Sequence, residues 1–261
     1  TPRHPPLVDG AGKHIAIGEG ADVVSRILMT GDGNRLIIGE NSRVAGFTPV
    51  GAGAALADPK QASAAGLTIQ GNGNTVEIAP DCRLGATLTV IGDNNHFRLG
   101  HGCTINGFVN LLSPTGSTLS IGAGTTMVQV SIQLHEPGEI TFGEDCMVSS
   151  QVYVSLSDIH PIYDRATGQR INAAASITIG NHVWLGLRSM IMKGATIGDG
   201  AVIAAGAILS GPAPANAVMA GVPARVAREN IMWRREISES PPEPTITAQS
   251  PRRGWWPFSR Q

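Results

Sequence analysis

The residues of this chain that are best suited to chemistry gather in one stretch, SDIHPIYDRATGQRIN, at residues 157–172. Its His160 carries an imidazole, the side chain that accepts a proton near neutral pH without special tuning. Asp158 and Asp164 could orient this ring or stabilise its protonated form, and Pro161 restricts the chain direction beside it. A lone histidine in a loop is more often a solvated side chain. The acidic neighbours make His160 a candidate general base.

Arg170 and Asn172 complete the polar set of this stretch. They are candidates either for the site itself or for holding the loop together.

An aliphatic residue recurs at every sixth position after this stretch, and a second, mostly small residue stands two positions before each. Short parallel strands with such a repeat stack about 4.8 Å apart and bury their aliphatic faces against one another. The sequence therefore predicts a parallel β-helix with a triangular coil. The aliphatic set is Ile179, Leu185, Ile191, Ile197, Ile203 and Leu209, and the second set is Ile177, Val183, Ser189, Ala195, Ala201 and Ala207.

Longer coils precede the hexapeptide region. Residues Ile17, Ile38, Ile78, Leu99, Ile121 and Phe142 follow one another at steps of 21, 40, 21, 22 and 21 residues. We interpret the step of 40 as two coils of about 21 residues. Asn34, Asn74 and Asn95 each stand four positions before such a residue. Because Asn and Gly tolerate left-handed backbone angles, these residues are expected to mark one corner of the coil.

The stretch with His160 breaks this period. Val154 and Ile179 are 25 residues apart, one more than four hexads. The stretch is therefore predicted to be an insertion that leaves the coil, and loops on a rigid scaffold are common places for functional sites.

The repeat ends at GPAPAN, residues 211–216, because prolines oppose further strand pairing. The following VARENIMWRREI has the spacing of a short amphipathic helix that could cover the open end of the coil. Cys82, Cys103 and Cys146 each fall two positions before an aliphatic residue, so core packing is favoured over a reactive role. Their number and spacing oppose a disulfide framework or a structural zinc site.

Composition excludes some classes of function. With 19 basic and 20 acidic residues the chain has no global field for nucleic acid or an anionic membrane. We find no apolar run long enough to span a membrane and no signal peptide at the start, so we expect a cytoplasmic location. A cluster of Trp255, Trp256 and Phe258 among basic residues near the end of the chain could contact the inner membrane surface, or belong to an unstructured tail.

Four motifs in order, SDIHPIYDRATGQRIN, ITIGNHVWLG, VIAAGAIL and AGVPARVARENIMW, resemble the hexapeptide-repeat O-acetyltransferases. The resemblance is strongest to the branch attached to capsular, exopolysaccharide and lipopolysaccharide biosynthesis. It is densest over residues 140–233, and the longer coils before them are also similar to those of this branch. It implies a left-handed coil, a homotrimer with active sites between neighbouring coils, acetyl-coenzyme A as co-substrate, no metal, and a saccharide hydroxyl as acceptor. His160 matches the family's catalytic base, with Asp158 as its neighbour. Direct transfer is consistent with the absence of a GxSxG motif.

The resemblance also implies a set of cofactor contacts. Trp184 matches an aromatic wall near the thiol end, Leu187 and Ala205 match contacts to the pantetheine arm, and Arg225 and Arg228 match basic residues near the nucleotide phosphates. The two arginines could instead cap the C-terminal segment. Ser210 and Gly211 match the next contact pair, although a Lys is common in the family where this chain has Gly211. Lys193 could meet a phosphate or be a solvated surface residue.

These motifs divide the chain into five expected segments. They are an N-terminal arm at 1–14, long coils at 15–139, a hexapeptide acetyltransferase region at 140–225 with an inserted loop at 156–176, a capping segment at 226–236 and a disordered tail at 237–261.

Three alternatives stay open. An N-acetyltransferase acting on an amino sugar would use the same base chemistry. A zinc carbonic anhydrase of β-helix type could use His96 and His101, but a third histidine at a suitable upstream distance is missing, and catalytic zinc needs three protein ligands. A non-catalytic β-helix scaffold would leave the His160 loop and the VWLG motif unexplained.

Overall fold

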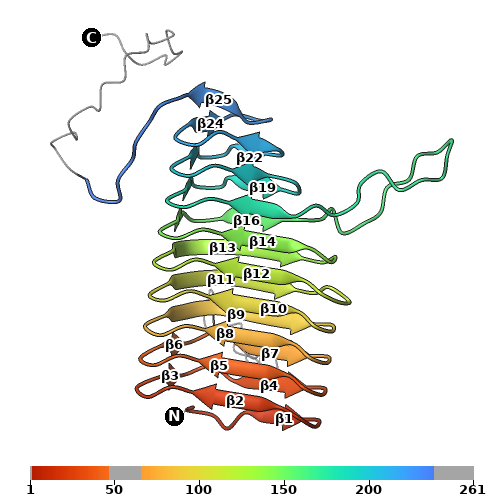
Figure 1. Cartoon of the computed structure of the whole chain (residues 1–261), viewed down its shortest axis with the longest axis vertical. Helices are drawn as coiled ribbons and strands as arrows, with labels where there is room; N and C mark the ends of the chain where they lie inside the picture. The colour runs from red at the N-terminus through yellow and green to blue at the C-terminus, as the bar shows by residue number, and fades with distance from the viewer. Residues whose placement is uncertain (1, 47–65, 238–261) are drawn as a thin grey trace, which may run out of the picture.

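A computed structural model of the chain describes residues 2–46 and 66–237, and every helix or strand assigned within them is a strand. The strands stack in coils along one long axis, with the N-terminal coil at one end and the last strand at the other (Figure 1). The predicted parallel β-helix is therefore confirmed. Its left-handed sense stays a prediction from the family resemblance.

Each coil contributes one strand to a parallel sheet of nine strands. Ladder pairing is direct from one coil to the next; for example, Phe97 lies between Val76 and Leu119. The nine strands, in order, are β2 (His14–Ile17), β5 (Arg35–Ile38), β8 (Thr75–Ile78), β10 (His96–Leu99), β12 (Thr118–Ile121), β14 (Glu139–Phe142), β17 (Ile177–Ile179), β20 (Thr196–Ile197) and β23 (Pro212–Ala213).

A sixteen-stranded sheet forms the rest of each coil as two rows of strands. The strands of the first row are β3 (Asp22–Val23), β6 (Arg43–Val44), β15 (Met147–Val148), β18 (Trp184–Leu185), β21 (Val202–Ile203) and β24 (Val218–Ala220). Those of the second row are β1 (Leu7–Asp9), β4 (Ile27–Thr30), β7 (Leu67–Gln70), β16 (Val152–Ser155), β19 (Met190–Met192) and β22 (Ile208–Leu209). Three longer strands run through both rows, β9 (Arg83–Ile91), β11 (Thr104–Leu111) and β13 (Thr126–Leu134), and β25 (Arg225–Arg228) closes the sheet.

The core runs along the axis of the coil. Both hexapeptide sets point inward, since every member from Ile177 to Leu209 is buried. The three cysteines are fully buried and unpaired, which confirms their predicted place in the core. Each small interior residue lets the larger aliphatic residues of adjacent coils pack without voids.

The step of 40 residues corrects one prediction. Ile38 pairs directly with Ile78, and Arg35 with Thr75, so one coil and not two separates them. Residues 47–65 belong to this interval and lie outside the described residues.

The asparagines of the long coils were predicted to take the left-handed backbone angles at the corner of the coil, and this prediction is also wrong. Asn34, Asn74 and Asn95 are buried and do not take left-handed angles; Gly73 (φ +65°) and Asn94 (φ +54°) do. Asn74 donates from its backbone and side-chain nitrogens to Asn34 Oδ1 at 2.9 and 3.1 Å, and Asn95 N donates to Asn74 Oδ1 at 2.9 Å. The corner needs one residue with positive φ and a second whose amide satisfies buried backbone groups. The buried asparagines have the second role.

The C-terminal helix was predicted wrongly. Residues 225–228 instead form β25, which pairs antiparallel with β24 at the end of the stack. The chain after it descends along the side of the coils (Figure 1). An extended segment advances about 3.3 Å per residue and a helix only 1.5 Å, so only the extended form reaches contacts on several coils.

The expected boundary at residue 15 is also too late. Leu7–Asp9, assigned to an N-terminal arm, pair in parallel with β4, so the coil begins within that arm. None of the described segments forms a helix of the length and apolar character needed to cross a membrane.

Candidate active site

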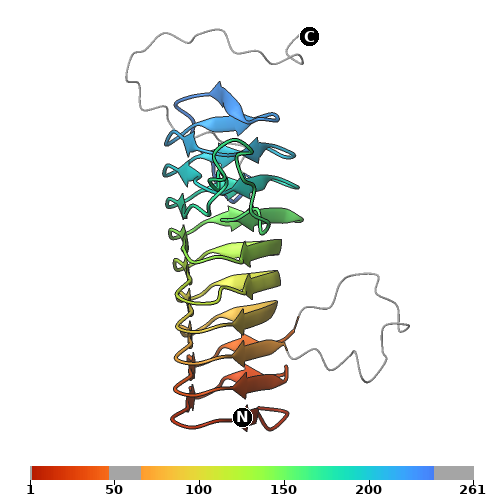
Figure 2. The same cartoon turned by 90° about the vertical axis from the view of Figure 1, so that its right-hand side faces the viewer.

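The loop with His160 leaves the stack between β16 and β17 and projects away from the coils (Figure 1); its position on the turned molecule can be followed in Figure 2. Tyr163 and Arg170 form an antiparallel bridge between its two arms. At the tip, Asp164 Oδ1 accepts from Ala166 N at 3.0 Å and from Thr167 N at 2.7 Å. The Thr167 backbone bond is the main cause of a lowered pKa of Asp164. This carboxylate therefore closes the tip turn and does not orient His160.

His160 is exposed to solvent, and its backbone is held by Asn172. Asn172 Nδ2 donates to His160 O at 2.8 Å, and Asn172 Oδ1 accepts from Ile162 N at 2.6 Å. Asn172 itself is buried. A buried amide that bonds on both sides of His160 leaves the imidazole free while fixing the chain that carries it.

The residue before His160 is strained. Ile159 has φ +66°, a left-handed conformation that β-branched residues rarely adopt. Its N–H donates to Ser157 Oγ at 2.8 Å, and Ser155 Oγ donates to Ser157 O at 2.7 Å. This turn directs the chain out of the coil immediately before the candidate base.

Asp158 faces the base of the loop. Its Oδ2 accepts from Lys193 Nζ at 2.5 Å and from Asn172 Nδ2 at 3.0 Å, and Lys193 Nζ also donates to Asn172 O at 3.1 Å. The hydrogen bond from Lys193, followed by that from Asn172, lowers the pKa of Asp158. Among the described residues this carboxylate makes no bond to the His160 ring, so it positions the loop and does not touch the imidazole. Lys193 is neither a solvated lysine nor directed to a phosphate.

A second ion pair braces the same loop. Arg170 donates from Nη1 and Nη2 to the two oxygens of Glu136 at 2.6 and 2.7 Å, and Ser157 Oγ donates to Glu136 Oε1 at 2.5 Å. These bonds, that from Arg170 first, lower the pKa of Glu136 to about 2. Bidentate pairs of this kind fix orientation as well as distance. We call Glu136, Arg170, Asn172, Asp158 and Lys193 the loop clamp.

Sequence reasoning assigned neither Glu136 nor Lys193 to this clamp. They stand 34 residues before Arg170 and 35 residues after Asp158, on different coils. Only the register of stacked coils brings them to the loop. A local pattern that could have identified them is absent from the sequence around either residue.

Three of the candidate cofactor residues, Trp184, Leu187 and Ala205, lie on or beside the corner between the two rows of the sixteen-stranded sheet, whereas Ser210 and Gly211 lie between β22 and β23, at the corner that carries the His160 loop. Trp184 begins β18 and pairs with Val202, and Gly206 N donates to Leu187 O at 2.8 Å. Leu187 and Ala205 therefore lie on neighbouring coils, and both are exposed. Trp184 and Leu187 retain 37% and 45% of their accessible surface, which is unusual for large apolar residues in a repeat this tight.

The backbone conformation at Gly211 accounts for a glycine at a position where lysine is common in the family that the sequence resembles. It takes φ +104°, a region that side chains other than glycine rarely adopt, although a Cβ there would meet no atom within 4 Å. Backbone conformation, and not space, thus favours glycine over lysine here. Ser210 beside it is exposed.

Arg225 and Arg228 lie in β25, opposite Ala220 and Val218 of β24. Both side chains are exposed, while their backbones close the last edge of the sheet. The two expected roles, phosphate contact and capping, are therefore compatible.

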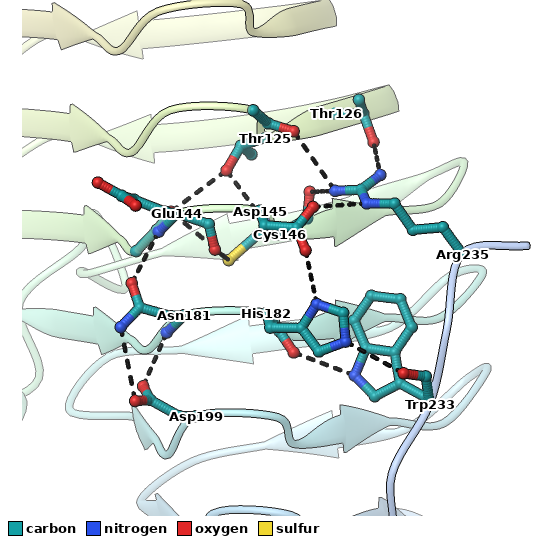
Figure 3. A network of polar contacts seen from close by, with 12 residues as sticks. Thr125, Thr126, Glu144, Asp145, Cys146, Asn181, His182, Asp199, Trp233 and Arg235 are labelled. Atoms are coloured by element: carbon teal, nitrogen blue, oxygen red, sulfur yellow. Dashed lines mark hydrogen bonds and ion pairs between the residues drawn. The ribbon is translucent and has the colours of Figure 1, made fainter. Parts of the chain in front are cut away.

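After β25, the C-terminal strap (residues 229–237) lies against the coils. Figure 3 shows the Trp233 ring against the His182 ring, with centroids 4.0 Å apart and planes 10° apart. His182 Nδ1 contacts Asp145 Oδ2 at 2.7 Å, and Arg235 Nε donates to Asp145 Oδ1 at 2.7 Å. Burial opposes ionisation of Asp145, but the bonds from His182 and Arg235 still lower its pKa. The sequence analysis did not predict these contacts, because the spacing of apolar residues in this segment is typical of a helix.

A row of polar side chains follows β11 and β13 toward the base of the loop. Asn110 Nδ2 donates to Gln133 Oε1 at 3.1 Å, and a ring nitrogen of His135 contacts the same oxygen at 3.0 Å. Burial lowers the pKa of His135. Amide, hydroxyl and imidazole groups of this kind suit a ligand rich in hydroxyls.

The histidines considered for zinc lie elsewhere. His96 starts β10, and His101 Nε2 is 3.0 Å from Asp81 Oδ2. Over residues 2–46 and 66–237, no group of three or more His, Cys, Asp or Glu side chains is arranged to hold a metal ion.

This chain is similar in sequence and in fold to known proteins. Residues 176–211 match the family model of the bacterial transferase hexapeptide (six repeats). The polysialic acid O-acetyltransferase of Neisseria meningitidis is 35% identical over 194 residues, which cover 66% of this chain and 90% of that protein. The crystal structure of the polysialic acid-specific acetyltransferase NeuO is similar with a TM-score of 0.57 and 28% identity over 89% of each chain. The polysialic acid O-acetyltransferase OatWY has a TM-score of 0.54 at 24% identity, covering 91% of this chain and 95% of its own, and supports the fold alone.

Proposed function

Since this chain belongs to the hexapeptide-repeat O-acetyltransferases of the capsule and polysaccharide branch, we propose that it transfers an acetyl group from acetyl-coenzyme A to a sugar hydroxyl of a bacterial capsular polysaccharide or exopolysaccharide, or of its precursor. One observation carries the proposal. His160 is an exposed imidazole on a loop whose backbone is fixed by buried Asn172 and by two ion pairs. Such bracing serves a side chain that must meet a substrate in one geometry.

His160 acts as the general base in this proposal. It takes the proton of the acceptor hydroxyl while that oxygen forms a bond to the thioester carbonyl carbon. The resulting tetrahedral oxyanion collapses, the carbon–sulfur bond breaks, and the thiolate of coenzyme A leaves and takes up a proton. Asp158 is a positioning residue, because its carboxylate holds the loop through Lys193 and Asn172.

The cofactor would lie along the exposed corner of the C-terminal coils. Trp184 would wall its thiol end, and Leu187 and Ala205 would contact the pantetheine arm. Ser210 and Gly211, the next matched contact pair, lie between β22 and β23, at the corner that carries the loop. Arg225 and Arg228, both exposed on β25, would meet the nucleotide phosphates.

A homotrimer is the proposed assembly, and the arrangement of each coil supports it. The loop leaves the corner between the second row and the nine-stranded sheet, whereas Leu187 and Ala205 lie at the corner between the two rows of the other sheet. One chain thus carries the base on one corner and the Leu187–Ala205 part of the cofactor surface on another. Packing of coils side by side would bring the loop of one chain to the cofactor surface of its neighbour.

The acceptor class follows from the relatives and from the polar row. Polysialic acid is the acceptor in the names of the relatives, and Asn110, Gln133 and His135 offer groups that bond to hydroxyls. We propose that the reaction takes place in the cytoplasm. The residues suggested for contact with the inner membrane surface, Trp255, Trp256 and Phe258, lie outside the described residues.

The test is the His160→Ala variant with Arg165→Ala as its control, because Arg165 is an exposed residue of the same loop. We expect kcat to fall by about 10²- to 10⁴-fold in His160→Ala, with acetyl-coenzyme A affinity by calorimetry and the assembly mass unchanged. Arg165→Ala should retain wild-type turnover. Turnover of His160→Ala at the wild-type rate would contradict the assignment.

The acceptor is identified by incubation with acetyl-coenzyme A and oligosaccharides, beginning with polysialic acid. NMR then locates the acetyl group. An ester at a sugar oxygen supports O-transfer, whereas an amide at an amino sugar would identify an N-acetyltransferase.

A further inference from the structure

The C-terminal strap is attached to the coils both above and below Trp233. Ile231 N donates to Asn216 O at 2.9 Å near the end of the stack. Arg235 donates from Nη1 to Thr126 Oγ1 at 2.7 Å and from Nη2 to Cys146 O at 2.8 Å (Figure 3). The coils of Cys146 and Thr126 lie three and four steps along the stack from that of Asn216. The position of Trp233 is therefore set from both sides.

Trp233 is also fixed by direct bonds to the coil. Its Nε1–H donates to His182 O at 3.0 Å, and Nε2 of His182 contacts Trp233 O at 3.1 Å, so backbone and side chain of each residue engage the other. The stacked rings add van der Waals contact over their faces. Few surface segments without regular structure are held by so many directional contacts.

The other side of Trp233 contacts Trp184. The two ring centroids are 5.9 Å apart and the planes are tilted by 45°, within the centroid distances at which aromatic rings attract each other. Trp184 retains 37% exposure, so the strap covers part of this indole and leaves another part open. The rotamer of Trp184 thus depends on a residue 49 positions away that belongs to the strap.

We propose that Trp233 is a positioning residue for the acetyl-coenzyme A site. Through docking of the strap it fixes the Trp184 indole in the orientation that walls the thiol end of the cofactor. This inference rests on the proposed function and deepens it, because it adds the strap to a site otherwise made by the coil. Loss of strap docking lets the indole rotate, and the thioester then lies less often in line with the acceptor oxygen.

The experiment compares four variants in the full chain: Trp233→Ala, Trp233→Phe, Arg235→Ala and the control Met232→Ala. Met232 belongs to the same strap but is exposed. Trp233→Ala removes the contact, and Arg235→Ala releases the strap without changing either tryptophan. We expect kcat/KM for acetyl-coenzyme A to fall about 3- to 10-fold in both, from the size of an aromatic pair contact.

The KM for the saccharide substrate shows whether the effect is confined to the cofactor site. Its KM should stay unchanged in all four variants, because the strap does not meet the loop clamp. Trp233→Phe should recover most of the activity, and Met232→Ala should match the wild type. Wild-type kcat/KM for acetyl-coenzyme A in both Trp233→Ala and Arg235→Ala would overturn the proposal, as would an effect in Trp233→Ala that Arg235→Ala does not reproduce.

A spectroscopic readout separates this proposal from the proposed function. In a background with Trp255→Phe and Trp256→Phe, only Trp184 and Trp233 are left, and two indoles this close give an exciton couplet in circular dichroism. The couplet should be lost in Trp233→Phe, reduced in Arg235→Ala and unchanged in Met232→Ala. An unchanged couplet in Arg235→Ala would refute the role of Arg235 in holding the strap, and a wild-type spectrum without the couplet would refute strap docking itself. An intact couplet in a wild-type protein that neither binds nor turns over acetyl-coenzyme A would refute the proposed function instead.

Discussion

Replacement of Lys193 by Met tests whether the loop clamp positions His160. Lys193 Nζ donates to Asp158 Oδ2 and to Asn172 O, so the variant removes two hydrogen bonds from one ammonium group while the aliphatic stem is retained. Asp158 keeps its bond from Asn172 Nδ2 at 3.0 Å. The backbone bond from Asn172 to His160 O then loses part of its support. We expect the loop to sample geometries in which the imidazole is displaced.

The magnitude follows from the exposure of the pair. Hydrogen bonds to charged groups contribute about 1.5–3 kcal/mol when buried. The side chains of Lys193 and Asp158 are 24% and 34% exposed, so solvent screening reduces their contribution toward the ~1 kcal/mol of a surface pair. A loss of ~1 kcal/mol in loop positioning corresponds to a decrease in kcat of up to about fivefold.

The assay is steady-state acetyl transfer with both substrates varied. In Lys193→Met, kcat should fall and KM for acetyl-coenzyme A should stay constant, because Lys193 contacts the loop and not the cofactor corner. Lys193→Arg should recover activity, since it restores a cation with several donors. Arg165→Met, which removes an exposed cation of the same loop, should behave as the wild type. Wild-type kcat in Lys193→Met, in an enzyme that His160→Ala inactivates, would refute the positioning role.

The pH dependence of stability gives the same test an independent readout. The pKa of Asp158 is lowered in the folded protein, so its contribution to stability is present above the ordinary aspartate pKa of 3.8 and is lost as the pH falls through its folded pKa. Without Lys193 that pKa moves back up. The difference in melting temperature between wild type and Lys193→Met should therefore be full at about pH 7 and shrink below about pH 4. An equal difference at both pH values would argue against this ion pair as its source.

Two further perturbations test the brace and the scaffold. Glu136→Gln weakens the bidentate pair with Arg170. Because the folded pKa of Glu136 is about 2, below the ordinary glutamate pKa of 4.5, the stabilisation by this pair is present above pH 4.5 and is lost as the pH falls toward 2. Tryptic cleavage at exposed Arg165 should accelerate in Glu136→Gln at neutral pH, and an unchanged cleavage rate would contradict a bracing role. Asn74→Ala leaves Gly92 O and Asn95 N without their buried partner and should lower the free energy of unfolding by about 2–4 kcal/mol in urea titration. Exposed Asn72→Ala should cost less than about 1 kcal/mol by the same measurement, and equal losses in the two variants would disprove the importance of burial.

Much of the scaffold could be read from the repeat. A period of six with large and small inward positions allows few structures other than a stacked parallel coil, because each strand must bury the same face against the coils above and below it. The buried cysteines and the excluded loop follow from the same count. Where this reasoning failed, one residue type had two possible roles. An asparagine near a glycine can take the left-handed turn or satisfy buried backbone groups, and Asn74 does the latter.

The helix prediction for the C-terminal segment was wrong for a different reason. The spacing of Ile231, Trp233 and Arg235 is compatible with a helix or with an extended strap, and contact with several coils decided between them. Propensity is a weak prior when tertiary contacts are this numerous.

The sequence alone determined the architecture and singled out His160 as the candidate base, because periodicity and local residue chemistry are carried by neighbouring positions in the chain. Only the tertiary structure decided how that histidine is held and what lies beside Trp184. Glu136, Lys193 and Trp233 reach their partners across 34 to 51 residues through the register of stacked coils. Register depends on packing of the whole solenoid, and no local pattern encodes the contacts that it creates.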